Sequence, residues 1–300
     1  RQRSIPDRKP TDKGPPMRLV ILTPATDNPR FAGTWPEWFE RLAAPLRAEG
    51  FAVEPAPWTE ASDLSGADAV LPLLAWGYHL KADLWAARLD AWERAGLRMP
   101  NPAATLRWNT AKTYLAELAG RGAPVVPTVA VERVTEEAVA EARARFATEV
   151  VVAKPQVSAG SQDTVRLKPG DPLDGAPRGP ALLQPFLPAV AQEGEQSLFY
   201  FNGVLSHAVA KAATGGDFRV QPQFGGQVAA MTPSAEMLAV GQAVLAAADR
   251  PLAYARVDLI RDLDGALKLM ELEAIEPDLY LQYAADGGAA FARGMRAALA

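Results

Sequence analysis

Short apolar runs alternate with amphipathic segments along the first hundred residues. Apolar runs beginning at Met17, Phe51 and Ala67 each fit a buried strand. Apolar positions recur at helical spacing over residues 35–49 and 80–96, and a glycine follows or ends each segment. Because strand and helix alternate, the pattern predicts a parallel sheet in a Rossmann-like α/β unit.

The pattern changes after residue 100. Helices are predicted over residues 101–118 and 135–146, the second with Thr135 as its N-cap, and a turn and strand over residues 122–131. Further strands are expected at 149–155, 162–167, 181–187, 197–203 and 204–212, and after a helix at about 233–249 a final hairpin spans 254–275. This order predicts antiparallel sheets in an α+β unit.

These changes divide the chain into four expected parts. Residues 1–16 are polar and proline-rich, which indicates a disordered extension or a cloning remnant. The expected parts that follow are an α/β domain over 17–103, a smaller subdomain over 104–190 and a larger subdomain over 191–300 that carries a metal site.

Composition narrows the function classes. The 31 Lys and Arg against 35 Asp and Glu give a net charge of -4, which disfavours a nucleic-acid or anionic-membrane surface. The absence of Cys excludes disulfides, thiolate zinc sites and a cysteine nucleophile, and 2 His exclude a His-rich metal centre. No apolar run reaches the roughly 20 residues of a membrane helix. We therefore expect a cytoplasmic protein with a small-molecule partner.

The last predicted hairpin carries four charged residues at period two. Arg256 and Asp258 share one face of the first strand, and Glu271 and Glu273 share one face of the second. If the three carboxylates converge, they provide hard oxygen ligands of the kind that Mg²⁺ requires. The alternative is a solvated sheet face on which the acids pair with Arg256 and Lys268. The apolar neighbours favour the buried metal site, since unpaired buried charge is costly.

A loop of small residues follows the strand that ends at Lys154. The loop contains Ser158, Ala159, Gly160 and Ser161, so that backbone N–H groups and hydroxyls have access to phosphate oxygens. It is no Walker loop, because GxxxxGK[ST] is absent. Taken alone, such a loop is more often an ordinary hairpin connection.

Other segments supply further candidates for a nucleotide site. Lys112 begins a predicted helix, Lys211 ends a strand, and Arg219 lies between glycine pairs, although each of the three also fits an ordinary surface residue. The backbone at Gln184, Pro185 and Phe186 suits hydrogen bonds to adenine, and Glu195 offers a carboxylate for a ribose. A plain junction of strand and loop gives the same pattern.

The first domain offers a substrate face. In parallel sheets, ligands bind beyond the carboxyl ends of the strands, which here places residues 23–28 and the loop of Trp76, Tyr78 and His79 together. Edge packing is an equal alternative for Trp76 and Tyr78, and His79 also fits the exposed start of a helix.

Taken in order, these motifs resemble the ATP-grasp superfamily over residues 101–280. The segment RVDLIRDLDGALKLMELEAIEP is similar to the corresponding part of D-alanine–D-alanine ligases and glutathione synthetases. The resemblance implies an ATP-grasp fold preceded by a Rossmann-like pre-ATP-grasp domain. The family pattern E-x-N ends here in Glu273, which keeps an oxygen ligand, adds a charge and leaves the number of Mg²⁺ ions at one or two.

The resemblance also implies a role for each motif. In this comparison Arg256 acts at the acyl centre and Arg219 at the phosphates. The carboxylates of Asp258, Glu271 and Glu273 bind Mg²⁺, for which Mn²⁺ can substitute. The implied ATP-binding residues are Lys112, Lys154, Ser158, Ala159, Gly160, Ser161, Gln184, Pro185, Phe186, Leu187, Glu195 and Lys211.

The segments RWNTAKTYL and GAPVVPT are similar to a group of ATP-grasp ligases that includes the cyclo-ligase forming D-cycloserine. This similarity makes Arg107 and the loop from Trp76 to His79 candidates for recognising an amino-acid-like substrate.

We therefore expect an ATP-dependent carboxylate–amine ligase that works through an acyl phosphate and releases ADP and phosphate. Its partners are a small carboxylate and an amine, and a homodimer is the habit of the family. The alternatives are a cyclo-ligase or a kinase on the same ATP site, or a nonenzymatic ATP-binding module. A dinucleotide-dependent oxidoreductase is disfavoured, because no GxGxxG follows the first strand.

Overall fold

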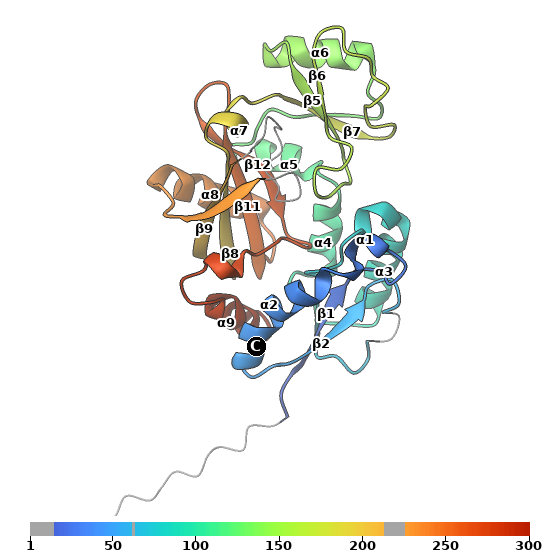
Figure 1. Cartoon of the computed structure of the whole chain (residues 1–300), viewed down its shortest axis with the longest axis vertical. Helices are drawn as coiled ribbons and strands as arrows, with labels where there is room; N and C mark the ends of the chain where they lie inside the picture. The colour runs from blue at the N-terminus through green and yellow to red at the C-terminus, as the bar shows by residue number, and fades with distance from the viewer. Residues whose placement is uncertain (1–14, 62–63, 213–225) are drawn as a thin grey trace, which may run out of the picture.

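Three sheets form the framework of the chain (Figure 1). The structure, a computed structural model, describes residues 15–61, 64–212 and 226–300. The first sheet has the order β2-β1-β3 and is parallel throughout, as the alternating pattern predicts. Its strands are β1 (Arg18–Thr23), β2 (Ala52–Pro57) and β3 (Ala69–Leu71).

Helices flank this first sheet. They are α1 (Pro29–Ala32), α2 (Trp35–Ala48), the 3-10 turn η1 (Tyr78–Lys81) and α3 (Ala82–Arg94). The strand predicted from Ala67 is shorter than expected, because regular pairing with β1 ends at Leu71. The chain then runs across the carboxyl end of the sheet, so that Trp76 and η1 lie at the edge where ligands bind in such folds.

The predicted helix over residues 101–118 is two helices, α4 (Ala103–Thr110) and α5 (Tyr114–Gly120). The break lies at Ala111, whose backbone is extended, with φ −102° and ψ 125°. The Lys112 N–H donates to the carbonyl of Gln156 over 2.8 Å, a tertiary bond that replaces a helical one. Lys112 therefore lies in a break between helices and not at a helix start.

The second sheet is antiparallel, with the order β4-β7-β5-β6. Its strands are β4 (Val129–Val131), β5 (Val151–Pro155), β6 (Val165–Leu167) and β7 (Ala181–Pro185). Helix α6 (Glu136–Phe146) covers it, and the hydroxyl of Thr135 accepts a bond from the Ala138 N–H, as expected for an N-cap. Figure 1 shows this unit apart from the first sheet.

The third sheet has the order β10-β9-β8-β11-β12 and is antiparallel. The strands are β8 (Glu195–Phe201), β9 (Val204–Ala212), β10 (Gln227–Met231), β11 (Tyr254–Arg261) and β12 (Leu267–Glu273). The helical segments are α7 (Ala189–Gln192), α8 (Ala235–Ala248), η3 (Leu281–Tyr283) and α9 (Ala289–Ala298). Asn202 and Gly203 both have positive φ, which confirms the predicted tight hairpin.

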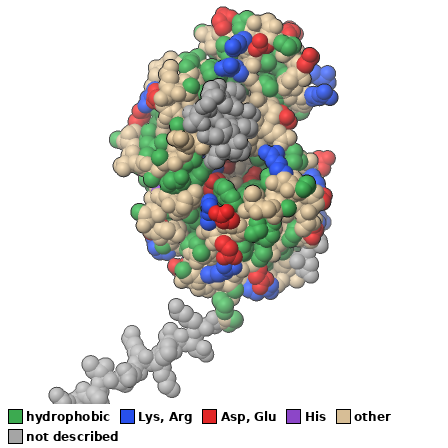
Figure 2. Space-filling view, viewed as in Figure 1, with side chains coloured by type: hydrophobic (Ala, Val, Ile, Leu, Met, Phe, Trp, Pro, Cys, Tyr) green, Lys and Arg blue, Asp and Glu red, His purple; other side chains and the backbone are tan. Residues whose placement is uncertain are grey.

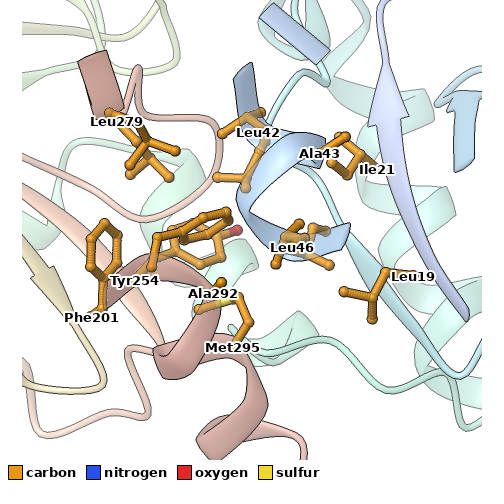
Figure 3. Packing of buried hydrophobic residues seen from close by; sticks show 14 of the residues in the cluster. Leu19, Ile21, Leu42, Ala43, Leu46, Phe201, Tyr254, Leu279, Ala292 and Met295 are labelled. Atoms are coloured by element: carbon orange, nitrogen blue, oxygen red, sulfur yellow. The ribbon is translucent and has the colours of Figure 1, made fainter. Parts of the chain in front are cut away.

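A shared apolar core joins the first and third sheets (Figure 3). Leu42 and Leu46 of α2 pack with Tyr254 of β11 and Met295 of α9, all of them buried. This packing holds the first sheet against the third, so that a site between them has fixed walls. No helix in the described ranges is both long and apolar enough to cross a membrane.

Candidate active site

A cavity of about 560 Å³ lies where the three sheets meet, and nearly every residue expected at the nucleotide and substrate sites lines it. Figure 2 shows this face hollowed, with acidic and hydrophobic side chains beside each other in the hollow. The predicted residues in its wall are Trp76, Tyr78, His79, Lys112, Lys154, Ser158, Ala159, Gly160, Ser161, Gln184, Pro185, Phe186, Leu187, Glu195, Lys211, Arg256, Asp258, Glu271 and Glu273.

Lys112 connects the break between α4 and α5 to two other elements. Its ammonium lies 3.0 Å from a carboxylate oxygen of Glu271 on β12 and donates to the carbonyl of Ser158 over 2.5 Å. Burial raises the pKa of Glu271, but the charges of Lys112 and Lys154 outweigh burial and hold it below its usual value. Glu271 is therefore an anion held between two lysines.

Lys154 ends β5 as expected, and only 7% of it is exposed. Burial lowers the pKa of its ammonium to about 8, and the negative charge of Glu271 opposes this shift. The loop after it turns at Gly160 and Ser161, which have φ values of 60° and 57°. Left-handed backbone is easy for glycine and less so for serine, and it turns successive N–H groups toward one side.

Asp258 is the centre of a buried charge network. Its carboxylate accepts bonds from the Arg256 guanidinium at 2.9–3.1 Å, from Lys211 at 3.1 Å and from the hydroxyl of Ser197. Burial raises its pKa, but Arg256 and Lys211 outweigh burial and keep the pKa well below its usual range. Lys211 also pairs with Glu195, so β8, β9 and β11 share one network.

Gly194 permits this arrangement of Glu195 and Lys211. Its φ is +76°, and an added Cβ would lie 2.1 Å from the carbonyl oxygen of Lys211. The chain therefore enters β8 in direct contact with β9, which only glycine allows.

Glu273 lies opposite Arg256 in the β11–β12 ladder, and their side chains pair at 2.5 Å. Burial raises the pKa of Glu273 to about 7, and Arg256 only partly offsets this. Beyond the strand, burial also raises the pKa of Asp278 to about 6 and that of Glu276 well above its usual value. This end of the cavity thus holds more carboxylates than its cations neutralise.

Part of the cavity wall is apolar. Val152, Ile260 and Met270 line it beside Gln184 and Phe186. Gln184 donates to the hydroxyl of Thr128 over 2.8 Å, and the Phe186 N–H donates to the carbonyl of Val150 over 2.9 Å. Apolar side chains suit the faces of a heterocycle, although the Phe186 N–H is already used within the sheet.

Residues of α1, α2 and η1, beside the first sheet, supply the remaining wall. The Trp76 ring contacts Phe31 and Trp38, each with ring centroids 5.5 Å apart. A ring nitrogen of His79 lies 3.1 Å from the side-chain oxygen of Gln162, which ties η1 to the segment that follows Ser161. Trp76, Tyr78 and His79 therefore face the cavity rather than a distant surface.

Arg107 and Arg219 are not among the residues that line the cavity in the described ranges. The prediction for Arg107 was wrong in placement: its guanidinium lies outside the cavity and pairs with Asp90 at 2.8 Å and Glu93 at 3.0 Å on the outer side of α3. The helical repeat of α4 turns it away from Asn109, which does line the cavity. Arg219 lies outside the described residues.

Sequence reasoning missed several wall residues. Arg30, Phe31 and Trp38 come from a segment read only as loop and helix, and Glu276 and Asp278 follow the last strand. The surplus of acids after ELE was a signal in the sequence, since the run ELEAIEPD adds two carboxylates just beyond the predicted metal site.

The donor set suits Mg²⁺ in its chemistry. Within the described ranges, no three His, Asp or Glu side chains gather into a ready metal cage. Magnesium in nucleotide sites is held through one or two carboxylates with phosphates and water, so such a cage is not required. Glu271 and Glu273, about a quarter exposed in the wall, fit this role, while Asp258 must first exchange a contact with Lys211 or Arg256.

The chain is similar to proteins that make cycloserine. Residues 19–101 match the model of the N-terminal domain of D-cycloserine synthetase DcsG. Cycloserine biosynthesis protein DcsG from Streptomyces lavendulae is 32% identical over 278 residues, which cover 85% of this chain and 91% of the relative.

Solved structures agree with this similarity. The crystal structure of D-cycloserine synthetase DcsG has a TM-score of 0.80 at 28% identity and covers 94% of this chain and 100% of its own. D-alanine–D-alanine ligase from Bacillus anthracis with ATP gives 0.67 at 14% identity, covering 94% and 97%. The ATP-grasp ligase PsnB with minimal precursor, Mg and ADP gives 0.63 at 19% identity, covering 94% and 97%.

The likenesses to D-alanine–D-alanine ligase and to PsnB concern the fold, which is the ATP-grasp fold expected from the sequence. The similarities to the Streptomyces lavendulae protein and to the DcsG crystal structure rest on sequence identity along most of the chain. The protein is therefore an enzyme of the ligase type and belongs to the DcsG family of ATP-grasp ligases.

Proposed function

We propose that this ligase uses Mg-ATP to convert a small carboxylate into an acyl phosphate and then joins the acyl group to an amine. The observation that carries the proposal is the composition of one cavity, whose wall combines apolar side chains with four buried cations among carboxylates. The apolar part would accept adenine, and the cations would accept phosphates.

Lys112, Lys154 and Lys211 would hold the phosphate oxygens, with the loop from Ser158 to Ser161 over them. Glu195 would hold the ribose, and Gln184, Pro185, Phe186 and Leu187 the adenine. Glu271 and Glu273, with Asp258 behind them, would hold one or two Mg²⁺ ions, or Mn²⁺ in their place. The metal, when bound, neutralises phosphate charge and so lowers the repulsion that a carboxylate meets at the γ-phosphorus.

The reaction then needs no protein nucleophile. A substrate carboxylate oxygen attacks the γ-phosphorus, and the bond to the bridging oxygen breaks, releasing ADP. The amine next attacks the acyl carbon, phosphate leaves with the electron pair of the broken C–O bond, and the amine loses a proton. Arg256 would stabilise the charge that develops on the acyl oxygen. The walls from the first domain would keep water from the acyl phosphate.

Intramolecular ring closure is the second candidate, and the 32% identity with DcsG over most of the chain favours it. In that case the attacking nitrogen belongs to the same amino-acid-like molecule as the carboxylate. The chemistry of activation is unchanged, and only the number of substrates differs.

The test is release of ADP and phosphate from Mg-ATP across amino acids and small carboxylates, with mass spectrometry of the products. A new amide between two molecules supports the ligase, and loss of one water from a single molecule supports ring closure. A stable phosphoester would identify a kinase instead. No binding of Mg-ADP by calorimetry would overturn the nucleotide site itself.

A further inference from the structure

His207 is a buried histidine that the proposed reaction does not use. It lies in β9, only 9% of it is exposed, and it is not among the described residues that line the cavity. Because side chains alternate along a strand, His207 shares one face of the third sheet with Lys211. Its neighbours on that face include Phe199 of β8, which belongs to the apolar core. A polar ring in such a place is costly unless its nitrogens are bonded.

Both ring nitrogens of His207 have partners. Nε2 lies 3.0 Å from the carbonyl oxygen of Leu279, and Nδ1 lies 3.1 Å from the hydroxyl of Ser206. A carbonyl oxygen only accepts, so Nε2 carries the hydrogen and donates it, and Nδ1 accepts from the hydroxyl. Burial lowers the pKa of His207, while bonds to the backbone beyond β12 and the charge of Asp286 oppose this shift. The ring is therefore neutral at pH 7 and held in one tautomer.

A β-bulge and a ring stack fix the direction of the His207 ring. The β8–β9 ladder pairs Phe199 with His207 and then passes over Ser206, which is an extra residue on β9. Bulges of this kind redirect neighbouring side chains and are frequent next to active sites. The His207 ring stacks on the Phe199 ring, with centroids 4.3 Å apart and planes 8° apart. The stack sets the plane of the imidazole, and the bulge supplies the hydroxyl for Nδ1.

Arg256 lies in the same row across the sheet as His207. The ladders pair Phe199 with His207 on one side and with Arg256 on the other. The two polar side chains also have adjacent targets. The Arg256 guanidinium donates to the carbonyl of Asp278 over 3.4 Å, and His207 donates to the next carbonyl, that of Leu279, over 3.0 Å. The His207 bond is the shorter of the two, so it holds the segment on which the longer Arg256 bond depends.

The segment held by these two bonds has a backbone that needs support. Tyr280 has φ 45° and ψ 40°, a left-handed conformation that is unfavourable for a large side chain. Its N–H donates to the carboxylate of Asp278 over 2.9 Å. Asp278 and Tyr280 line the cavity, whereas Leu279 between them is buried in the apolar core. Loss of the His207 donor therefore acts directly on a strained part of the cavity wall.

We infer that His207 is a positioning residue for the acyl step, because its Nε2–H holds residues 278–280 against the third sheet and so keeps Arg256 aligned. The inference rests on the proposed function, in which Arg256 stabilises the charge that develops on the acyl oxygen. Asp258 and Glu273 hold the guanidinium from within the sheet, and the Asp278 carbonyl is its contact outside the sheet. His207 acts through that outer contact.

Two substitutions separate the hydrogen bond from the ring. His207→Gln keeps a side-chain N–H near the position of Nε2 and loses the stack on Phe199, whereas His207→Phe keeps a flat ring and loses the donor. We expect His207→Phe to lower kcat about 10- to 100-fold, as for a misplaced catalytic group, and His207→Gln to stay within about threefold of the wild type. His207→Leu, which also lacks a donor, replaces His207→Phe if that variant does not fold.

The rate measured is ADP release from Mg-ATP with the fastest substrate among the amino acids and small carboxylates tested above. Affinity for Mg-ADP, measured by calorimetry, should change by less than about twofold in both variants, since the step affected is the chemical one. The same titration reports that each variant is folded.

Hydrogen exchange follows the segment without any substrate. Amide exchange of residues 278–283, measured by mass spectrometry, should be about tenfold faster in His207→Phe than in the wild type, which corresponds to the loss of one hydrogen bond. Exchange in His207→Gln should stay close to that of the wild type. General destabilisation would instead speed exchange throughout the third sheet.

Full kcat in folded His207→Phe would overturn the inference, and so would unchanged exchange of residues 278–283 in that variant. A loss of kcat in His207→Gln as large as in His207→Phe would overturn it as well, because the ring and not the donor would then matter. A wild type that binds no Mg-ADP, or binds it without turnover of any substrate tested, would instead reject the proposed function. The exchange measurement then still decides whether His207 holds the segment.

Discussion

The ammonium of Lys112 lies 3.0 Å from a carboxylate oxygen of Glu271, although 159 positions separate the two residues in the chain. Both side chains line the cavity, and only 7% of the lysine side chain is exposed. The pair fixes the break between α4 and α5 against β12. The charge of Lys112 also helps to hold the pKa of Glu271, a proposed metal ligand, below its usual value.

Replacing Lys112 with Met should reduce kcat/KM for Mg-ATP by about 100-fold or more. The change removes a cation from the proposed phosphate site and leaves a buried carboxylate with one lysine fewer, and breaking such pairs costs about 3–5 kcal/mol. Initial rates of ADP release over a range of Mg-ATP concentrations provide the measurement.

Lys268→Met is the matched control, because Lys268 lies on the same strand as Glu271 and pairs outside the cavity with the buried Asp262 and, at 2.7 Å, with Asp264. It should leave kcat/KM within about twofold. Equal losses in the two variants would mean that the Lys112 effect is a general consequence of removing a lysine.

The pKa of Glu273 predicts a pH dependence of both stability and metal binding. Burial raises this pKa to about 7 against the charge of Arg256, with Glu271 and Asp258 adding to the rise and Lys211 opposing it. Because the folded protein binds this proton more tightly than the unfolded chain, the contribution to stability is complete below about pH 4.5 and is lost as pH rises through about 7. Mg-ADP should bind more tightly over the same rise, since Mg²⁺ requires the carboxylate anion.

Calorimetric titration with Mg-ADP at pH 6 and pH 8 should therefore reveal an affinity higher at pH 8 by about tenfold, as expected for a group that ionises at about pH 7. Glu273→Gln removes the titrating group and should flatten this difference. It should also weaken the loss of thermal stability between the same two pH values. An unchanged pH profile in the variant would assign the dependence to the nucleotide or to another carboxylate.

Much of the charged site follows from period two. The sequence predicts Asp258 and Arg256 on one strand facing Glu271 and Glu273 on the next, and the ladder pairs Asp258 with Glu271 and Arg256 with Glu273. The pairing itself is not given by the turn alone, because the ladder shifts by one residue between Asp258 and Leu259, and this bulge brings Asp258 opposite Glu271.

Features that depend on distant contacts were not predictable in this way. The break at Ala111 depends on a bond to Gln156, and helical periodicity alone continues through it. Arg107 shares its helix with Asn109, and the choice of which one faces the cavity is made by packing against α3 and β12. Trp38 and Glu276 join one wall only because α2 packs on η3 and α9, which follow the third sheet in the chain.

Gly194→Ala should destabilise the fold by several kcal/mol and weaken Mg-ATP binding. Its Cβ would meet the carbonyl oxygen of Lys211 at 2.1 Å, so β8 must move away from β9 and separate Glu195 from Lys211. Urea unfolding gives the change in stability, and the KM for Mg-ATP gives the effect on the site.

Gly203→Ala separates backbone strain from this collision. Gly203 has nearly the same φ, +77°, but an added Cβ there meets nothing within 4 Å. It should cost only about 1 kcal/mol, which is the usual cost of a left-handed alanine, and leave KM unchanged. A loss in Gly194→Ala no greater than this would contradict the close contact.

Asn109 holds the strand that carries Glu273. Its side-chain amide donates to the carbonyl of Leu272 over 2.8 Å and accepts from the Ala274 N–H over 2.8 Å, so both neighbours of Glu273 are fixed by one buried residue. Asn109→Ala leaves the Ala274 N–H without its partner, at a cost of about 1–3 kcal/mol, while the Leu272 carbonyl keeps the hydrogen bond that it accepts from the Tyr114 hydroxyl over 2.9 Å. Because the strand end then becomes less ordered, Mg-ADP affinity should fall together with stability.

Arg107→Ala on the same helix is the control, since its exposed pairs with Asp90 and Glu93 are worth at most about 1 kcal/mol. Chemical unfolding and Mg-ADP calorimetry on both variants provide the comparison. Stability loss in Asn109→Ala with unchanged Mg-ADP affinity would mean that Glu273 keeps its place without this clamp. A loss of activity in folded Arg107→Ala would instead return Arg107 to the site, against its position on the outer face of α4.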